Sequence, residues 1–247
     1  MKWDSTLYDS KHDFVAEYGK ELLEFIPQSS TQTILDLGCG TGVLTAQLAS
    51  KCRKLIGVDS SPDMIDKARK QYREIDFRVA DALDLPFNKE IDVVFSNAVF
   101  HWISDHDRLL KSVYKALKPG GMLICEFGAE GNIVTIEKAF AIACRNLGYE
   151  YRSKFNFPSV ITFREKLERN GFIIDSIYDF ARPTLLKDGE LGLENWLKQF
   201  FASELAAMPQ QDSARVLEQV TNLTRESLWN GKAWIADYRR LRAIAHI

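Results

Sequence analysis

Residues 33–42, which read TILDLGCGTG, decide the fold of this chain. Asp36 stands at the end of a short apolar run, and Gly38, Gly40 and Gly42 follow at alternate positions before a helical pattern. Glycines let a backbone turn sharply and approach a ligand closely, and the N-terminus of a helix offers unpaired N–H groups to a carboxylate or phosphate. The stretch therefore predicts a strand, a ligand-binding turn and a helix.

Two other glycine-rich motifs fail on spacing. A dinucleotide fingerprint, GxGxxG, that starts at Gly38 needs a third glycine where this chain has Val43, and one that starts at Gly40 meets Thr45 instead. The phosphate-loop pattern GxxxxGK[ST] occurs nowhere in the sequence. The turn is therefore predicted to hold something other than a dinucleotide or a nucleoside triphosphate.

Apolar runs alternate with helical patterns from residue 33 to about residue 127, which is typical of a mostly parallel sheet. An amphipathic pattern over Phe14–Phe25 predicts a helix that lies over the open edge of this sheet. The expected strands are Thr33–Leu37, Lys54–Val58, Asp76–Val79, Ile91–Ser96 and Met122–Phe127.

The pattern changes after residue 127. A helix, a loop of sequence FNFPS, a second helix closed by Gly171 and a β-rich stretch are expected, followed by two long helices around Pro209 and a strand-like end. We interpret the two long helices as a cap inserted between the last two strands. The residues concerned are Thr135–Leu147, Thr162–Asn170, Phe172–Ala181, Glu190–Leu228 and Trp234–Ile247.

Acidic residues close the first three predicted strands. Asp59 follows Gly40 by nineteen residues and stands at the end of the second strand, and Asp81 follows the third. Ligands of open α/β sheets bind at the carboxyl ends of the strands, where a carboxylate can accept both hydroxyls of a ribose. Together with Asp36 and the glycine turn, these acids predict a nucleoside site.

The composition excludes several classes of protein. A chain of 247 residues with 46% hydrophobic and 27% charged residues is long enough for a sizeable core and is not typical of disorder. A net charge of −2 offers no basic surface for nucleic acid. The charged opening MKWDSTLYDSKHDF and the lack of a long apolar run predict a cytoplasmic protein without a membrane span. Four scattered cysteines predict reduced thiols and no metal site.

Five motifs together resemble the class I S-adenosylmethionine-dependent methyltransferases. They are DLGCGTG at 36–42, Asp59, the pair Asp81 and Ala82, DVVFSNA at 92–98 and LKPGG at 117–121. The resemblance implies an α/β fold, a seven-stranded Rossmann-like sheet with helices on both faces and a small helical cap. It also implies S-adenosylmethionine as cofactor and S-adenosylhomocysteine as product.

We expect a single methyltransferase domain over residues 1–247. Residues 1–30 would form a lid helix, 31–130 the cofactor-binding core and 131–247 the C-terminal strands, with the cap at about 188–229. The expected partner is a small-molecule acceptor, with neither nucleic acid nor membrane, and the chain is expected to be a monomer or homodimer.

The resemblance also implies roles for individual residues. The turn that contains Asp36, Cys39 and the three glycines would lie against the methionine part of the cofactor, and Asp59 would bind its ribose. The remaining cofactor residues would be Ser60 and Met64 beside the adenine, Asp81 and Ala82 at its edge, and Asn97 and Ala98 at the methyl-transfer end.

A narrower resemblance concerns the acceptor. Trp3, Asp4 and Tyr8, together with NAVFHWISDH at 97–106, look like the trans-aconitate methyltransferase group, whereas the C-terminal part departs from that group. A carboxylate is ionised at neutral pH and needs no general base, which suits a sequence without a recognisable catalytic triad. We therefore expect a carboxylate oxygen as acceptor, with Asn97, His101 and Tyr8 as catalytic candidates. His101 could act as a general base or a positioning group, and Tyr8 could close over the cofactor.

Other functions stay open at this point. The malonyl-acyl-carrier-protein O-methyltransferases are also similar through the cofactor half, although an acyl carrier would need a basic docking patch. Methylation at carbon or nitrogen of a lipid, quinone or amine suits the apolar cap. A non-catalytic sensor of S-adenosylmethionine would keep the same glycine turn, while a dehydrogenase is disfavoured by Val43.

Overall fold

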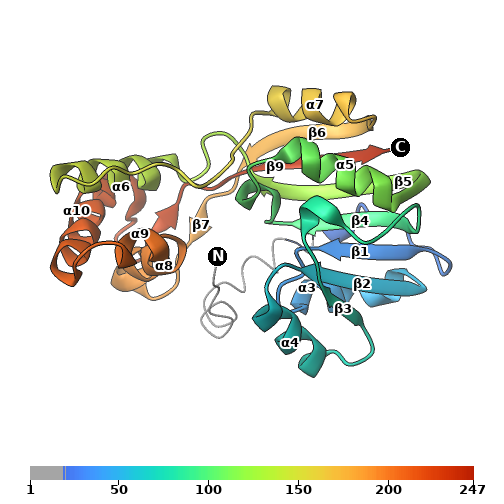
Figure 1. Cartoon of the computed structure of the whole chain (residues 1–247). Coiled ribbons are helices and arrows are strands. Elements are labelled where there is room, and N and C mark those ends of the chain that lie inside the picture. Colours follow the sequence, from blue (N-terminus) through green and yellow to red (C-terminus); the bar gives the residue numbers. More distant parts are fainter. Residues whose placement is uncertain (1–18, 20) are drawn as a thin grey trace. The chain divides into compact units, whose positions relative to one another are not determined.

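The computed structural model describes residue 19 and residues 21–247 (Figure 1). The chain divides into two compact units. Unit 1 holds the described residues up to Ala129 together with Phe155–Asp179 and Leu241–Ile247. Unit 2 holds Glu130–Lys154 and Phe180–Arg240. Each unit is described by itself below.

The seven-stranded sheet has the order β3-β2-β1-β4-β5-β9-β6 (Figure 1). The first five of these strands pair in parallel. Ile247 exchanges backbone hydrogen bonds with Gly120 and Gly121, while Arg242 reaches Glu126, so β9 runs antiparallel to β5. The strands are β1 Thr33–Leu37, β2 Lys54–Asp59, β3 Asp76–Val79, β4 Ile91–Asn97, β5 Leu117–Gly128, β6 Ile173–Ala181 and β9 Arg239–His246.

The five strands predicted between residues 33 and 127 are confirmed, with β1 and β3 matching residue for residue. The largest difference is in β5, which begins at Leu117 rather than Met122 because Leu117 already pairs with Ile91 of β4. A register shift between Ile91 and Val93 accommodates this longer start beside β4. The carboxyl ends of β1, β2 and β4, where the ligand edge was predicted, lie side by side in the sheet.

One face of the sheet carries an apolar core with α5 (His106–Ala116) and α7 (Val160–Arg169). Leu109, Leu110 and Val113 of α5 are fully buried, as expected for an amphipathic helix with apolar residues three and four apart. Asp105 caps α5, because its carboxylate accepts the backbone N–H of Arg108 at 3.0 Å.

The opposite face carries a second core, with α3 (Val43–Leu48) over it, so that helices cover both faces as predicted. Leu22, Leu23 and Ile26 pack there against residues of the central strands, among them Phe95 and Ile124. The prediction that the Phe14–Phe25 helix lies over the open edge is therefore wrong for its described residues from Glu21 to Phe25, while Phe14–Tyr18 lie outside the described residues. Its apolar side chains bury more surface against the middle of the sheet than an edge strand could offer.

A third cluster lies under the glycine turn. Ile65 and Ala68 of α4 (Pro62–Gln71) pack with Cys39 and Phe77 of β3. Short 3-10 helices complete the connections of the chain, at η1 Ala49–Lys51, η2 Ala82–Asp84, η3 Phe100–Trp102 and η4 Gly189–Leu191.

Unit 2 is mainly helical and also contains a small antiparallel pair of strands, β7 (Thr184–Leu185) and β8 (Ile235–Ala236). Its core is aromatic: the rings of Phe140 and Phe201 lie 4.3 Å apart, and the indole N–H of Trp196 donates to the hydroxyl of Tyr238 at 2.7 Å. The helices are α6 Val134–Asn146, α8 Gly192–Phe200, α9 Ala202–Ala206 and α10 Gln210–Leu228.

Two predictions for this region are wrong in detail. The first of the two long helices is interrupted at Phe201, which leaves helical geometry while its ring is buried in the aromatic core. One strand was expected over Trp234–Ile247, but the structure has two, because strand geometry is interrupted between Ala236 and Arg239. The division into lid, core and cap stays a prediction. Among the described residues, no helix is both long and apolar enough to cross a membrane.

Candidate functional site

The glycine turn is held to the end of β2 by its own backbone. Gly38 and Cys39 both donate their N–H to the carbonyl of Val58, at 2.8 and 3.0 Å, and Gly42 donates to the carbonyl of Cys39 at 3.0 Å. Gly40 donates to the carboxylate of Asp59. The prediction that this turn offers unpaired N–H donors to a ligand is therefore wrong for these four residues, since each of these N–H groups fixes the shape of the turn.

The space around the turn distinguishes its three glycines. All three have positive φ, at 79°, 55° and 83°, a conformation that favours glycine. A Cβ on Gly38 would stand 2.2 Å from a methyl carbon of Val99, and one on Gly42 would stand 2.7 Å from the ring of Phe77. A Cβ on Gly40 would meet no heavy atom within 4 Å. Gly40 therefore borders open space, whereas the other two need glycine for packing.

Asp36 lies below the turn and is only 3% exposed. Its Oδ2 accepts a hydrogen bond from the hydroxyl of Thr45 in α3 at 2.6 Å, which ties the end of β1 to the helix that follows. Burial, opposed by that hydrogen bond and reinforced by the negative charge of Asp59, raises the pKa of Asp36 to about 7. Asp36 therefore stabilises the glycine turn by linking the strand before it to the helix after it.

Asp59, at the end of β2, has both carboxylate oxygens engaged by backbone. Oδ2 accepts the N–H of Gly40 at 3.0 Å, and Oδ1 accepts that of Ser61 at 2.9 Å. Burial raises the pKa of Asp59, although hydrogen bonds from the backbone of Ser61, Gly40 and Ser60 oppose the rise. The predicted ribose ligand is thus also the residue that joins the glycine turn to the end of β2.

The residues predicted for the adenine lie on the two connections that follow β2 and β3. Met64, in the first turn of α4, is 4% exposed, and its N–H is capped by the hydroxyl of Ser61 at 3.4 Å. Ser60 is exposed just before that cap. Asp81 is exposed and caps η2 by accepting the N–H of Leu83 at 2.9 Å, and Ala82 opens η2.

Cys39 faces away from any ligand in the turn. Its side chain packs with Ile65, Ala68 and Phe77, and burial raises the pKa of the thiol far above its usual range. Only the backbone of Cys39 is therefore placed to line a ligand site.

The end of β4 is strained. Ala98 has a φ of +62°, which is uncommon for a residue with a side chain, and its N–H donates to the carbonyl of Glu126 at 2.7 Å. Asn97 precedes it, half-buried and in register with Glu126. Unusual backbone of this kind clusters at ligand sites, because the surrounding structure must hold it in place. The backbone of Asn97 and Ala98 is therefore held in a fixed conformation at the end of β4 by its pairing with Glu126.

His101 lies in η3 directly after this strand end and is 7% exposed. Its Nδ1 accepts the backbone N–H of Gly128 at 3.2 Å, and its ring packs against Trp102 and Phe157 at centroid distances of 5.2 and 5.7 Å. Because an N–H can only donate, Nδ1 must carry a lone pair, so the proton of the neutral ring is on Nε2. Tyr8, the remaining catalytic candidate, lies outside the described residues.

Three further polar residues near this strand end did not emerge from the sequence motifs. Glu126 and Arg242 form a buried ion pair, and Asn156 bonds the loop that contains His101. A signal for Arg242 was present in the alternation RRLRAIAH at 239–246, where arginines alternate with apolar residues in a strand. Asn156 gave no such signal, because its partners lie more than 50 residues away.

Comparison with known proteins decides the family. The methyltransferase domain family matches residues 35–125. An uncharacterised methyltransferase of Schizosaccharomyces pombe is 33% identical to the chain over 99% of its length and 97% of the length of that protein. The chain belongs to the class I S-adenosylmethionine-dependent methyltransferases. The predicted family, enzyme class and cofactor are thereby confirmed.

Two further relatives show how far the likeness of this methyltransferase extends. The trans-aconitate 2-methyltransferase of Methylobacterium radiotolerans is 35% identical over 49% of this chain and 47% of that enzyme, so the chain spans about half of its length. The YcgJ protein of Bacillus subtilis has the same fold, with a TM-score of 0.67 and 15% identity over 95% of this chain and 98% of that one. The predicted α/β methyltransferase fold is confirmed.

Proposed function

We propose that this methyltransferase methylates a carboxylate oxygen of a small molecule. The observation that carries the proposal is the hydrogen bond from the N–H of Gly128 to Nδ1 of His101. It leaves the neutral imidazole with a donor at Nε2, while its one nitrogen lone pair, on Nδ1, is engaged by the N–H of Gly128. An acceptor that arrives already ionised suits such a site, because it needs a donor to orient it and no base to activate it.

The residues at the carboxyl edge of the sheet fit the cofactor. The open space at Gly40 is where a ligand can approach the backbone, and the carboxylate of Asp59 lies at the edge of that space with its position fixed by two N–H groups. Ser60, Met64, Asp81 and Ala82 would hold the adenine, Asp36 would support the turn, and Asn97 and Ala98 would lie at the methyl-transfer end.

When bound, the cofactor supplies an electrophilic methyl group on a sulfonium centre. The task of the chain is then to exclude water and to hold the acceptor oxygen in line with that group. The rigid end of β4 serves the second task, because Ala98 is fixed by its bond to Glu126 and His101 by its bond to Gly128. His101 would orient the acceptor by donating from Nε2, and Asn97 is the second polar group available to do so.

The relatives support an acid as acceptor. The Methylobacterium radiotolerans enzyme is named for trans-aconitate, which is a tricarboxylate, and its likeness to this chain covers 49% of the chain. An amine or an enol acceptor would have to lose a proton, and the lone pair of His101 that could accept it is already engaged by the N–H of Gly128. Methylation at nitrogen or carbon is therefore the second candidate, and a sensor without turnover is the third.

Transfer of labelled methyl from S-adenosylmethionine tests the reaction directly. The acceptor panel contains mono-, di- and tricarboxylic acids, acyl-carrier thioesters and a metabolite extract, and the products are treated with base. We expect label that base releases as methanol, since esters hydrolyse in base. Base-stable label would contradict carboxylate methylation, and tight cofactor binding without transfer to any member of the panel would favour the sensor.

Substitution of His101 tests its role. Gln can both accept from Gly128 and donate to an acceptor, whereas Phe can do neither, so His101→Gln should keep most of the activity and His101→Phe should lose it. His246→Gln, on β9 and paired with Asp175, is the matched control. A general base would instead make His101→Gln inactive and would make the wild-type rate fall as the pH drops through about 6 to 7, the ordinary range of imidazole.

A further inference from the structure

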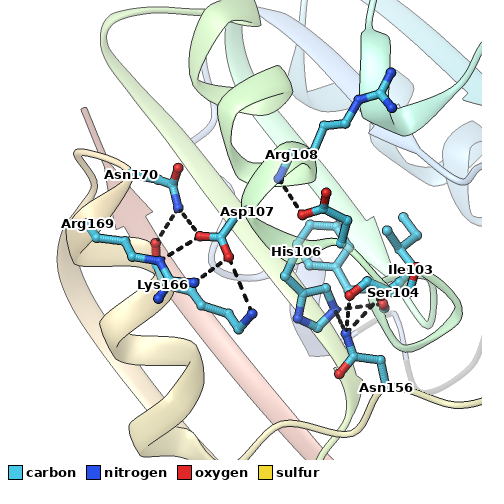
Figure 2. Close-up of polar contacts among 11 residues, drawn as sticks. Ile103, Ser104, His106, Asp107, Arg108, Asn156, Lys166, Arg169 and Asn170 are labelled. Carbon is cyan, nitrogen blue, oxygen red and sulfur yellow. Dashed lines mark hydrogen bonds and ion pairs between the residues drawn. The ribbon is translucent and has the colours of Figure 1, made fainter.

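A single residue, Asn156, makes three hydrogen bonds to the loop that contains His101. The backbone N–H of Asn156 donates to the carbonyl of His101 at 2.9 Å, and its side-chain Nδ2 donates to the carbonyls of Ile103 at 2.9 Å and Ser104 at 3.1 Å. Figure 2 shows these side-chain contacts and a third, to His106, with the amide of Asn156 aimed at the loop ahead of α5. Three carbonyls of one short loop are thus held by one residue.

The neighbours of Asn156 hold the same loop from the side. The rings of Phe155 and Phe157 are stacked, with centroids 5.2 Å apart and an angle of 10° between their planes. Phe155 packs against Trp102 at 5.0 Å, and Phe157 packs against His101 at 5.7 Å. The FNF segment, Phe155–Phe157, therefore contacts both aromatic residues of η3.

Below the loop, the start of α5 has further contacts of its own besides Nδ2 of Asn156, which lies 3.3 Å from Nε2 of His106. His106 is fully buried, and its Nε2 donates to the carbonyl of Phe100 at 2.9 Å. Its ring packs against Phe127 and Phe163 at 5.8 and 5.6 Å, and burial is the main reason why the pKa of His106 is lowered. Because His106 has these other partners, the part of the loop that depends most on Asn156 is the part around Ile103 and Ser104, whose carbonyls its amide binds.

We propose that Asn156 is a positioning residue for methyl transfer, which holds the loop between β4 and α5 so that His101 keeps the orientation in which it donates to the acceptor. The proposal rests on the proposed function of His101. Without the amide of Asn156, two loop carbonyls would turn to water and the loop would gain several conformations. The imidazole would then meet the acceptor in only a fraction of the molecules.

Asn170 provides a matched control. It is also a half-buried asparagine of unit 1, and its Nδ2 also makes two hydrogen bonds, to Asp107 at 2.9 Å and to the carbonyl of Lys166 at 2.8 Å. Figure 2 shows it on the far side of α5 from Asn156, within the ion-pair cluster of Asp107 and Arg169. Its loss should lower stability without reaching His101.

The kinetic experiment compares Asn156→Ala, Asn156→Gln and Asn170→Ala with whichever acceptor the wild-type protein uses, at a temperature well below all melting points. We expect Asn156→Ala to lower kcat/KM for the acceptor at least tenfold while the Kd for S-adenosylmethionine stays within twofold. Asn156→Gln, which keeps the amide donors, should recover part of the loss, and Asn170→Ala should stay within twofold of wild type. Equal kinetics for both alanine variants would overturn the proposal.

A second measurement needs no acceptor. In protein with 15N-labelled histidine, the ring nitrogens of His101 should show a single neutral tautomer with the proton on Nε2, and Asn156→Ala should replace it by averaging between tautomers. If Asn156→Ala does not fold, Asn156→Ser, which keeps a shorter donor, is measured in its place. An unchanged His101 signal would overturn the proposal. Base-stable methyl product would instead contradict carboxylate methylation while leaving this measurement intact.

Discussion

Arg242 on β9 donates from both Nε and Nη2 to one carboxylate oxygen of Glu126 on β5, at 2.9 and 2.6 Å. The two side chains are 7% and 1% exposed. Arg242 also donates to the hydroxyl of Tyr178 on β6 at 3.2 Å, and its guanidinium lies over the ring of Phe25 at 5.2 Å. This arginine therefore connects three adjacent strands with the N-terminal segment, next to the strand end where Ala98 is held by Glu126.

Removal of Arg242 should be costly, because it leaves the carboxylate of Glu126 buried without its cation. We expect Arg242→Met to lower the free energy of unfolding by about 3–5 kcal/mol. The double variant with Glu126→Leu should be more stable than Arg242→Met alone, since it removes the buried carboxylate that has lost its cation. Lys198→Met, which breaks an exposed pair with Glu194, should cost less than about 1 kcal/mol. Urea denaturation measures all three, and additive losses at Arg242 and Glu126 would contradict the pairing.

Alanine at two glycines of the turn should affect different properties, cofactor affinity at Gly40 and stability at Gly42. Gly40→Ala places a Cβ in open space, so we expect a stability loss of about 1 kcal/mol from its positive φ but at least a tenfold weaker affinity for S-adenosylmethionine. Gly42→Ala pushes a Cβ against Phe77 and should lose about 2–4 kcal/mol of stability. Gly148→Ala, also at positive φ and in open space, reports the conformational cost alone. Unchanged cofactor affinity in Gly40→Ala would show that the space at Gly40 is not the ligand site.

Loss of the Asp59 carboxylate should weaken the cofactor complex. We expect Asp59→Ala to reduce the binding free energy of S-adenosylmethionine by roughly 1 to 3 kcal/mol, from charge-assisted bonds to the ribose and from a looser glycine turn. Isothermal calorimetry on the folded variant measures the affinity. Asp63→Ala, at an exposed acid in the first turn of α4, serves as the control and should bind as wild type does. An affinity equal to wild type in Asp59→Ala would remove this residue from the site.

Asp36 should make the stability of the protein depend on pH. Its pKa of about 7 in the folded state lies above the ordinary value of 3.8, so the folded protein holds a proton that the unfolded chain releases. Stability from this group is therefore complete below about pH 4 and falls as the pH rises toward 7. Asp36→Asn, which removes the titration, should gain about 2 kcal/mol relative to wild type between pH 5.5 and pH 8. Urea denaturation at both values tests this, and an equal difference at the two pH values would contradict it.

The glycine turn shows what local sequence can predict. Its position between β1 and α3 follows from an apolar run, three glycines and a helical pattern that are contiguous in the chain. The acids Asp59 and Asp81 were predictable for the same reason, because parallel strands bring their carboxyl ends to one edge. The use of the N–H groups of the turn was not predictable, since their acceptor is the carbonyl of Val58 on the neighbouring strand.

The helical segments show the same limit. The amphipathic pattern before β1 gives a helix but not the face on which it packs, and the structure places Leu22 and Leu23 against the middle of the sheet. The pattern over Glu190–Phe201 is helical throughout, yet the helix stops at Phe201 because the aromatic core of unit 2 holds that ring. Tertiary packing overrides helix propensity in such places, because propensity differences amount to less than about 1 kcal/mol per residue.

By itself, the sequence determined the order of strands and helices through the core, the glycine turn and the acids beside it, and thereby the class of enzyme. These features depend on local periodicity and on short motifs, which any chain segment carries with it. Only the tertiary structure decided the tautomer of His101, the ion pair of Glu126 with Arg242 and the hydrogen bonds from Asn156 to the loop between β4 and α5. Each of these joins residues between 27 and 116 positions apart, and no local pattern records a partner at that distance.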